Sequence, residues 1–168
     1  RGPTNLIGLL TEEERARGVI CSSAGNHSQG VAIAARQYGV QAVVCMARNA
    51  TPSKIAATKG YGAEVVLHGS IWDEANEKAL ELVQERGLIY VHPFDDPSLI
   101  AGQGTVGLEI IEDWPGVEMI IVPIGGGGLI SGVSMAVKSV KPQVRVIGVE
   151  SSGAPAMKKS VERGRLIT

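Results

Sequence analysis

Short apolar runs alternate along the chain with segments in which apolar residues recur at the helical period. Six runs of strand length predict buried strands at residues 19–22, 42–46, 63–67, 88–91, 119–124 and 144–149. The intervening segments predict helices at residues 4–17, 26–39, 51–60, 70–87, 96–112, 129–140 and 154–163. A strand, a helix and a second strand in this order form right-handed units with parallel strands. We therefore predict an α/β fold with open, mostly parallel sheets flanked by helices.

The composition indicates a folded protein whose ligand is a small molecule. Hydrophobic residues make up 44% of the 168 residues, charged residues make up 20%, and the formal net charge is −1. No basic run is interleaved with aromatic residues, so the charge pattern of a nucleic-acid-binding or membrane-surface protein is missing. No apolar run approaches the roughly 18 residues that cross a bilayer.

The cysteines and histidines do not have the spacing of a metal site. Cys21 and Cys45 have no partner two or three residues away, which argues against a disulfide framework or a zinc site and favours a reducing, cytoplasmic location. His27, His68 and His92 have no second histidine four residues away and no cysteine at ligand spacing. We therefore predict no metal bound by these side chains.

Four consecutive glycines follow one predicted strand and precede a predicted helix. Gly125, Gly126, Gly127 and Gly128 place bare backbone amides at a helix start, which is a site for an anion such as phosphate. The spacing fits neither the P-loop nor the G-x-G-x-x-G pattern of dinucleotide-binding domains. A simple tight turn is the alternative, although glycines cost conformational entropy that an ordinary turn does not require.

A second polar loop occupies the equivalent place after the strand at residues 19–22. Ser23, Ala24, Gly25, Asn26 and His27 crowd a helix start and could bind a carboxylate through backbone amides and the Ser23 hydroxyl. The alternative is a structural role, with Ser23 or Asn26 as the helix N-cap. Glu150, 22 residues after Gly128, could instead bind a ribose in a dinucleotide-binding oxidoreductase domain.

Five motifs, taken together and in order, closely resemble the threonine ammonia-lyase (threonine dehydratase) and serine racemase family. This family belongs to the pyridoxal-phosphate enzymes with the tryptophan-synthase-β-like fold, and the resemblance covers essentially the whole chain. The motifs are the SAGNHSQG segment at residues 23–30, HPFDDP at 92–97, GQGT at 102–105, the four glycines at 125–128 and VIGVE at 146–150.

The resemblance implies a cofactor, two binding loops and two domains. Gly125 to Gly128 with Leu129 would hold the phosphate of pyridoxal 5′-phosphate, and Asn26 would bond the 3′-oxygen of its ring. Ser23, Ala24, Gly25, Asn26 and His27 would receive the substrate carboxylate. Residues 18–95 would form a small domain, and residues 1–17 and 96–168 would form part of a large cofactor-binding domain.

The resemblance also implies β-elimination and deamination of L-threonine or L-serine by a cytoplasmic homo-oligomer. The lysine that forms the Schiff base lies in the family two residues before the position of Arg1, so we expect this chain to be an internal piece that is inactive alone. The lysines in the chain do not match that motif; they are Lys54, Lys59, Lys78, Lys138, Lys141, Lys158 and Lys159.

Two positions of the chain differ from residues that parts of this family carry. The racemases carry serine where this chain has Ala24, and a methyl group cannot deliver a proton, so we expect elimination and keep serine racemase as the alternative. The family's cation site uses a glutamate, a carbonyl four residues later and an aspartate six residues later; Glu150 is followed at these positions by Ala154 and Ala156, so one ligand, the aspartate, is missing. That leaves Glu150 as a weak metal candidate. A non-catalytic binding module is a further alternative.

Overall fold

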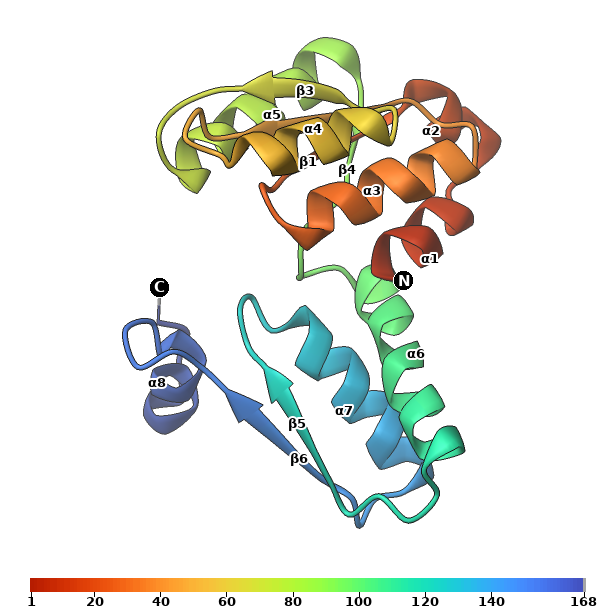
Figure 1. Cartoon of the computed structure of the whole chain (residues 1–168), viewed down its shortest axis with the longest axis vertical. Coiled ribbons are helices and arrows are strands. Elements are labelled where there is room, and N and C mark those ends of the chain that lie inside the picture. Colours follow the sequence, from red (N-terminus) through yellow and green to blue (C-terminus); the bar gives the residue numbers. More distant parts are fainter. Residues whose placement is uncertain (168) are drawn as a thin grey trace. The chain divides into compact units, whose positions relative to one another are not determined.

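The computed structural model describes residues 1–167, which divide into two compact units between Gly102 and Gln103. Both units are built from strands and helices in alternation (Figure 1). All strand pairs in the two sheets are parallel. The prediction of an α/β fold with parallel sheets flanked by helices is confirmed.

The first unit contains a four-stranded sheet in the order β3-β2-β1-β4. Its strands are β1 (Val19–Ser22), β2 (Ala42–Met46), β3 (Glu64–Leu67) and β4 (Ile89–Tyr90). Its helices are α1 (Gly2–Leu9), α2 (Glu12–Arg17), α3 (Asn26–Gln37), α4 (Pro52–Gly60) and α5 (Trp72–Arg86). The polar loops that follow β1, β2 and β3 therefore meet at one edge of the sheet, because parallel strands end on the same side.

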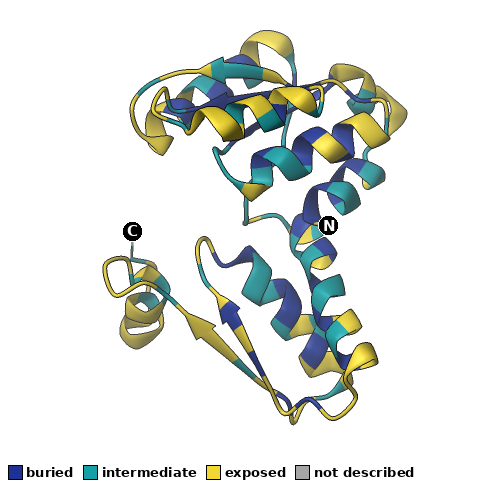
Figure 2. Ribbon diagram, in the orientation of Figure 1, coloured by how far each residue is buried: buried dark blue, intermediate teal, exposed yellow. Residues whose placement is uncertain are grey.

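Every residue of the two central strands of this sheet, β1 and β2, is buried (dark blue in Figure 2). Val19 and Cys21 belong to one apolar cluster, together with Leu6 and Val31 from α1 and α3. Ile20 belongs to a second cluster on the opposite face. Burial on both faces explains why the sequences of these strands are apolar runs without alternating polar residues.

The predicted single helix at residues 4–17 is wrong, because two helices occupy this segment. Leu10 is extended, with φ −62° and ψ 143°, and ends α1. Thr11 then starts α2 through a capping box: the Glu14 amide donates to Thr11 Oγ1 at 3.2 Å, and the Thr11 amide donates to Glu14 Oε2 at 2.8 Å. A threonine followed three residues later by glutamate is a helix start signal.

The second unit contains one parallel strand pair, β5 (Met119–Pro123) and β6 (Arg145–Val149), joined through α7 (Gly128–Val140). The helix α8 (Ala156–Arg163) follows β6, and α6 (Pro97–Asp113) spans the division between the units. Gly107 lets α6 approach α7 closely, because a Cβ atom there would lie 2.8 Å from Val137 Cγ2. Val137 belongs to the buried valine-rich core of this unit.

The boundary between the compact units, after Gly102, differs from the predicted domain boundaries. The predicted small domain comprises residues 18–95, and residues 1–17 and 96–168 are predicted to belong to the large domain. Leu6 and Ile7 of α1 are buried in the same cluster as Val31 and Ala35 of α3, so the start of the chain packs within the first unit. The assignment of these segments to domains of a whole protein stays a prediction. Within residues 1–167, no helix is long and apolar enough to cross a membrane.

Candidate functional site

The tetraglycine loop, residues 125–128, leads from β5 into α7. The Ile124 amide still bonds to β6, donating to the Val149 carbonyl at 2.8 Å, and α7 begins at Gly128. Gly125 and Gly126 are exposed, whereas Gly127 and Gly128 are buried. The loop is thus placed at the carboxyl end of a parallel strand and at the start of a helix, where ligands of α/β proteins bind.

The backbone amides of this loop are available to a ligand. Within the described part of the chain, the amides of residues 125–130 donate to no carbonyl or side chain, and the first amide of α7 with a partner is that of Ser131, which donates to the Gly127 carbonyl at 3.0 Å. The positive end of the α7 dipole adds to their attraction for an anion. The loop therefore fits a phosphate group.

Gly127 has a backbone conformation that only glycine adopts easily. It is the N-cap of α7, with φ +94° and ψ −14°. A Cβ atom there would also lie 2.8 Å from Cε of Met157, at the start of α8. A side chain at this position would strain the backbone that presents the free amides.

The serine loop, residues 23–27, leads from β1 into α3. The Ser23 amide continues the ladder to β2 by donating to the Cys45 carbonyl at 3.1 Å, and the Gly25 amide donates to Ser23 Oγ at 3.1 Å. Ser28 Oγ donates to the Gly25 carbonyl at 2.7 Å. Gly25 is the N-cap of α3 and no side chain caps this helix, so the alternative in which Ser23 or Asn26 is the cap is wrong.

Several donors of the serine loop remain free for a carboxylate. Among residues 1–167, the amides of Ala24, Asn26 and His27 have no acceptor. Ser23 Oγ accepts from Gly25, which leaves the proton of its hydroxyl available. These groups lie at the start of α3, where the helix dipole also favours a negative charge.

His27 anchors the serine loop as a neutral side chain. Its Nε2 lies 3.1 Å from the Val91 carbonyl just after β4. Burial lowers the pKa of His27 below its ordinary value of 6.5, the bond to Val91 opposes this shift, and His92 adds to it. The imidazole is therefore neutral at pH 7 and donates its Nε2 proton to Val91, so it brings no positive charge to a bound carboxylate.

A pocket of about 320 Å³ adjoins the serine loop at the same edge of the sheet. Ser22, Ser23 and Ala24 form one wall of this pocket, and Trp72 at the start of α5 forms part of another. The Trp72 indole Nε1 donates to the Ser22 carbonyl at 3.1 Å. No pattern in the sequence predicts this contact, because helical periodicity does not show which distant strand end a side chain at a helix start reaches.

Glu150 has a structural role in the second unit. The amides of Met157 and Lys158 donate to its two carboxylate oxygens at 2.9 and 2.7 Å. The Glu150 side chain thus caps α8. Its carboxylate, which a ribose or a metal ion would need, is already bonded to the helix. Within residues 1–167, no group of three or more histidine, cysteine, aspartate or glutamate side chains is arranged for a metal ion.

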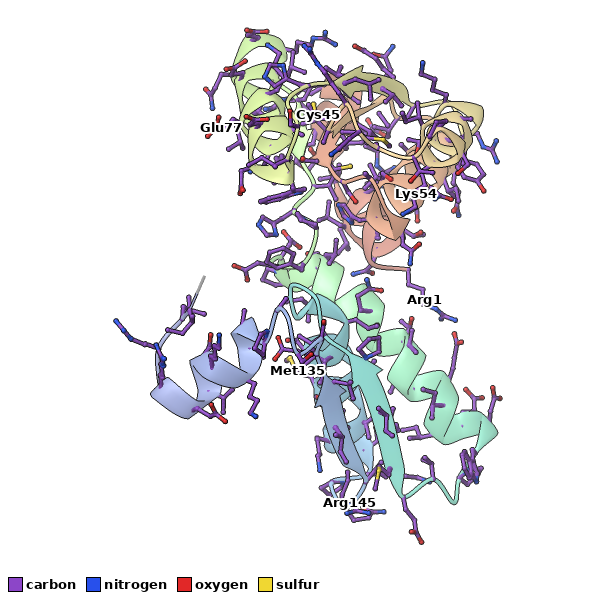
Figure 3. All side chains as sticks on the ribbon, turned by 60° about the vertical axis from the view of Figure 1, so that its left-hand side comes forward. Arg1, Cys45, Lys54, Glu77, Met135 and Arg145 are labelled. Carbon is purple, nitrogen blue, oxygen red and sulfur yellow. The ribbon has the colours of Figure 1, made fainter. Side chains whose placement is uncertain are left out.

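The lysines lie on helices or beyond their ends, outside both loops. Lys54 is exposed on α4 of the first unit (Figure 3). Lys78 pairs with Glu81 at 2.8 Å, and Lys158 lies 3.8 Å from Glu162. Lys138 donates to the Pro142 carbonyl at 2.9 Å, near the end of α7 opposite the tetraglycine loop.

Comparison with known proteins gives relatives along the whole chain. The model of the pyridoxal-phosphate dependent enzyme family matches residues 1–168. An L-threonine ammonia-lyase of Thermotoga maritima is 56% identical over 165 residues, which are 98% of this chain and 41% of that protein. A catabolic L-threonine dehydratase of Escherichia coli is 48% identical over 168 residues, which are 100% of this chain and 51% of that protein.

Solved structures are similar over the same span. Threonine deaminase isoform 2 of Solanum lycopersicum is 43% identical with a TM-score of 0.95, over 99% of this chain and 49% of that one. Maize serine racemase is 38% identical with a TM-score of 0.96, over 99% of this chain and 51% of that one. The chain therefore spans about half the length of the relatives that it matches.

Proposed function

This chain belongs to the family of pyridoxal-phosphate dependent enzymes, and we propose that it supplies the cofactor-phosphate loop and the substrate-carboxylate loop of an L-threonine ammonia-lyase. The whole protein would eliminate the β-hydroxyl of L-threonine and release 2-oxobutanoate and ammonia. The observation that carries this proposal is the run of free amides at residues 125–130, which suits the one group of the cofactor with two negative charges. Threonine ammonia-lyases at 48–56% identity support the choice of reaction.

The tetraglycine loop would hold the cofactor at its phosphate. Gly125, Gly126, Gly127, Gly128 and Leu129 would donate backbone hydrogen bonds to the phosphate oxygens, and Asn26 would bond the 3′-oxygen of the ring. Bound pyridoxal phosphate supplies an electron sink for the α-carbon of an amino acid. The residues of this chain contribute binding and orientation.

The serine loop would hold the substrate carboxylate with neutral donors. The Ser23 hydroxyl and the free amides of Ala24, Asn26 and His27 could each donate a charge-assisted hydrogen bond. Neutral donors at a helix start fix the position of the carboxylate without placing a fixed positive charge beside the α-carbon. The neutral state of His27 is consistent with this arrangement.

The setting of the whole protein is also part of the proposal. Two buried free thiols, Cys21 and Cys45, suit a reducing cytoplasmic compartment. The formal net charge of −1 gives no reason to expect a nucleic-acid or membrane partner. A homo-oligomer is what the family resemblance implies.

The proposal is tested on the full-length protein with the variant Gly127→Ala. We expect the unaltered protein with pyridoxal phosphate to form 2-oxobutanoate from L-threonine. The Gly127→Ala variant should bind pyridoxal phosphate about tenfold more weakly, since the strained backbone loses roughly one charge-assisted hydrogen bond, while its affinity for pyridoxal without phosphate should be unchanged. Both affinities are measured by absorbance titration.

Gly39→Ala is the matched control for backbone strain. Gly39 also has a positive φ, +68°, but a Cβ atom there meets nothing within 4 Å, and the residue lies in the first unit. This variant should keep the cofactor affinity of the unaltered protein. Absence of 2-oxobutanoate would refute the assigned reaction, and an equal loss of affinity for both forms of the cofactor would refute the phosphate role of the tetraglycine loop.

A further inference from the structure

The last carbonyl of β1 has an unusual hydrogen-bond partner. β4 pairs with β1 only at Val19 and Ile20, and the final bond on that side runs from the Val91 amide to the Ile20 carbonyl at 2.8 Å. Carbonyls two residues apart on a strand point to the same side, so the Ser22 carbonyl lies beyond the end of this ladder. The Trp72 indole N–H, 50 residues away along the chain, donates to it at 3.1 Å.

We propose that Trp72 is a positioning residue for the serine loop, which it anchors through the carbonyl of Ser22. This inference rests on the proposed function, because the loop that Trp72 anchors is the one that would bind the substrate carboxylate. Trp72 touches neither substrate nor reacting atoms in this role. Its hydrogen bond fixes the peptide that joins Ser22 to Ser23, and so it fixes the starting point of the loop.

The surroundings of the loop offer few other anchors. The pocket of about 320 Å³ beside Ser22, Ser23 and Ala24 leaves this wall of the loop without close packing. The Ser22 hydroxyl is buried and has no hydrogen-bond partner in the described part of the chain, so the side chain of Ser22 adds no anchor of its own. Two other hydrogen bonds hold the loop in place. The Ser23 amide donates to the Cys45 carbonyl of β2, and His27 Nε2 donates to the Val91 carbonyl.

Removing the indole N–H should loosen substrate binding rather than slow the reaction. The carboxylate contacts are the same in the substrate complex and in the transition state, so a loosened loop raises KM and leaves kcat nearly unchanged. We expect about a threefold to tenfold rise in KM for L-threonine, which corresponds to one net hydrogen bond. A role only in folding would lower kcat through loss of active protein and would leave KM unchanged.

The experiment compares three variants of the full-length protein. Trp72→Phe removes the N–H and part of the ring, and benzothienylalanine in place of Trp72 keeps both fused rings and removes only the N–H. Trp114→Phe is the control, because Trp114 is the other tryptophan of the chain and is 64% exposed in the second unit. KM and kcat for L-threonine are measured for each, together with hydrogen exchange of the Ser23 and Gly25 amides.

Both Trp72 variants should raise KM and speed exchange at Ser23 and Gly25, whereas Trp114→Phe should change neither. Equal KM values in the Trp72 variants and the control would overturn the inference, and so would a fall in kcat with KM unchanged. If the unaltered protein shows no activity on L-threonine, the proposed function fails instead. The exchange measurement then still decides whether Trp72 anchors the loop.

Discussion

Ala24 is the residue of the serine loop that bears on the type of reaction. It is half-buried beside Ser22 and Ser23, and its methyl group stands where the family resemblance implies a hydroxyl in the racemases. Racemisation needs an acid on the face of the α-carbon opposite the base, and a methyl group cannot donate a proton. The residue therefore supports the proposed elimination, even though a serine racemase is among the similar structures.

The variant Ala24→Ser should shift the products formed from L-serine. We expect the unaltered full-length protein to form pyruvate with little D-serine, and the variant to raise the fraction of D-serine several-fold, because a hydroxyl at position 24 can return a proton to the α-carbon. Pyruvate and D-serine are quantified in the same incubation. Ala24→Gly, which adds no proton donor, is the control. Abundant D-serine from the unaltered protein would contradict the assignment.

Residue types predicted the two loops but not the contacts that hold them. Gly125 to Gly128 and Ser23 were recognisable because glycine and serine beside a strand end and a helix start expose amide and hydroxyl donors to an anion. Trp72 contacts Ser22, just before the serine loop, from 50 residues away, and Val91 contacts His27 of the loop from 64 residues away. Such contacts depend on which strand ends become neighbours, and a single sequence does not specify this.

The strands and most helices are predictable from the sequence because their signals are local. The central strands are continuous apolar runs buried on both faces, and Asp96 starts α6 by accepting the Leu99 amide at 2.9 Å, as the Asp-Pro pair suggested. The break between α1 and α2 is not visible in the composition of the segment, because Glu12, Glu13 and Glu14 suit the solvated face of one continuous helix as well as the first turn of a second helix. The capping box at Thr11 and Glu14 was the signal that could have located it.

Glu150, a candidate binding residue in the sequence, stabilises the start of α8 instead. Glu150→Ala should reduce the free energy of unfolding by about 0.5–2 kcal/mol and speed amide exchange in α8, because two amides at the start of the helix lose their acceptor. Chemical denaturation and hydrogen exchange measure these effects. Glu162→Ala is the control: it removes an exposed pair with Lys158 on the same helix and should cost less than about 0.5 kcal/mol. Equal effects of the two variants would contradict the capping role of Glu150.

This chain holds two candidate binding loops but no identified catalytic base. The tetraglycine loop belongs to the second unit and the serine loop to the first. None of the chain's lysines falls within either loop. The family resemblance assigns the Schiff-base lysine to a motif that these lysines do not match. Cofactor binding and turnover should therefore be separable experimentally.

The 168 residues expressed by themselves should bind pyridoxal phosphate but form no 2-oxobutanoate from L-threonine. Binding of the phosphate uses the free amides of residues 125–130, whereas turnover needs a base for the α-proton, and loss of a general base alone typically costs about 10²–10⁴-fold in rate. The assay measures 2-oxobutanoate with excess cofactor, in parallel with the full-length protein under identical conditions. Turnover by that chain would show that a residue within it acts as the base and that the expected position of the lysine is wrong.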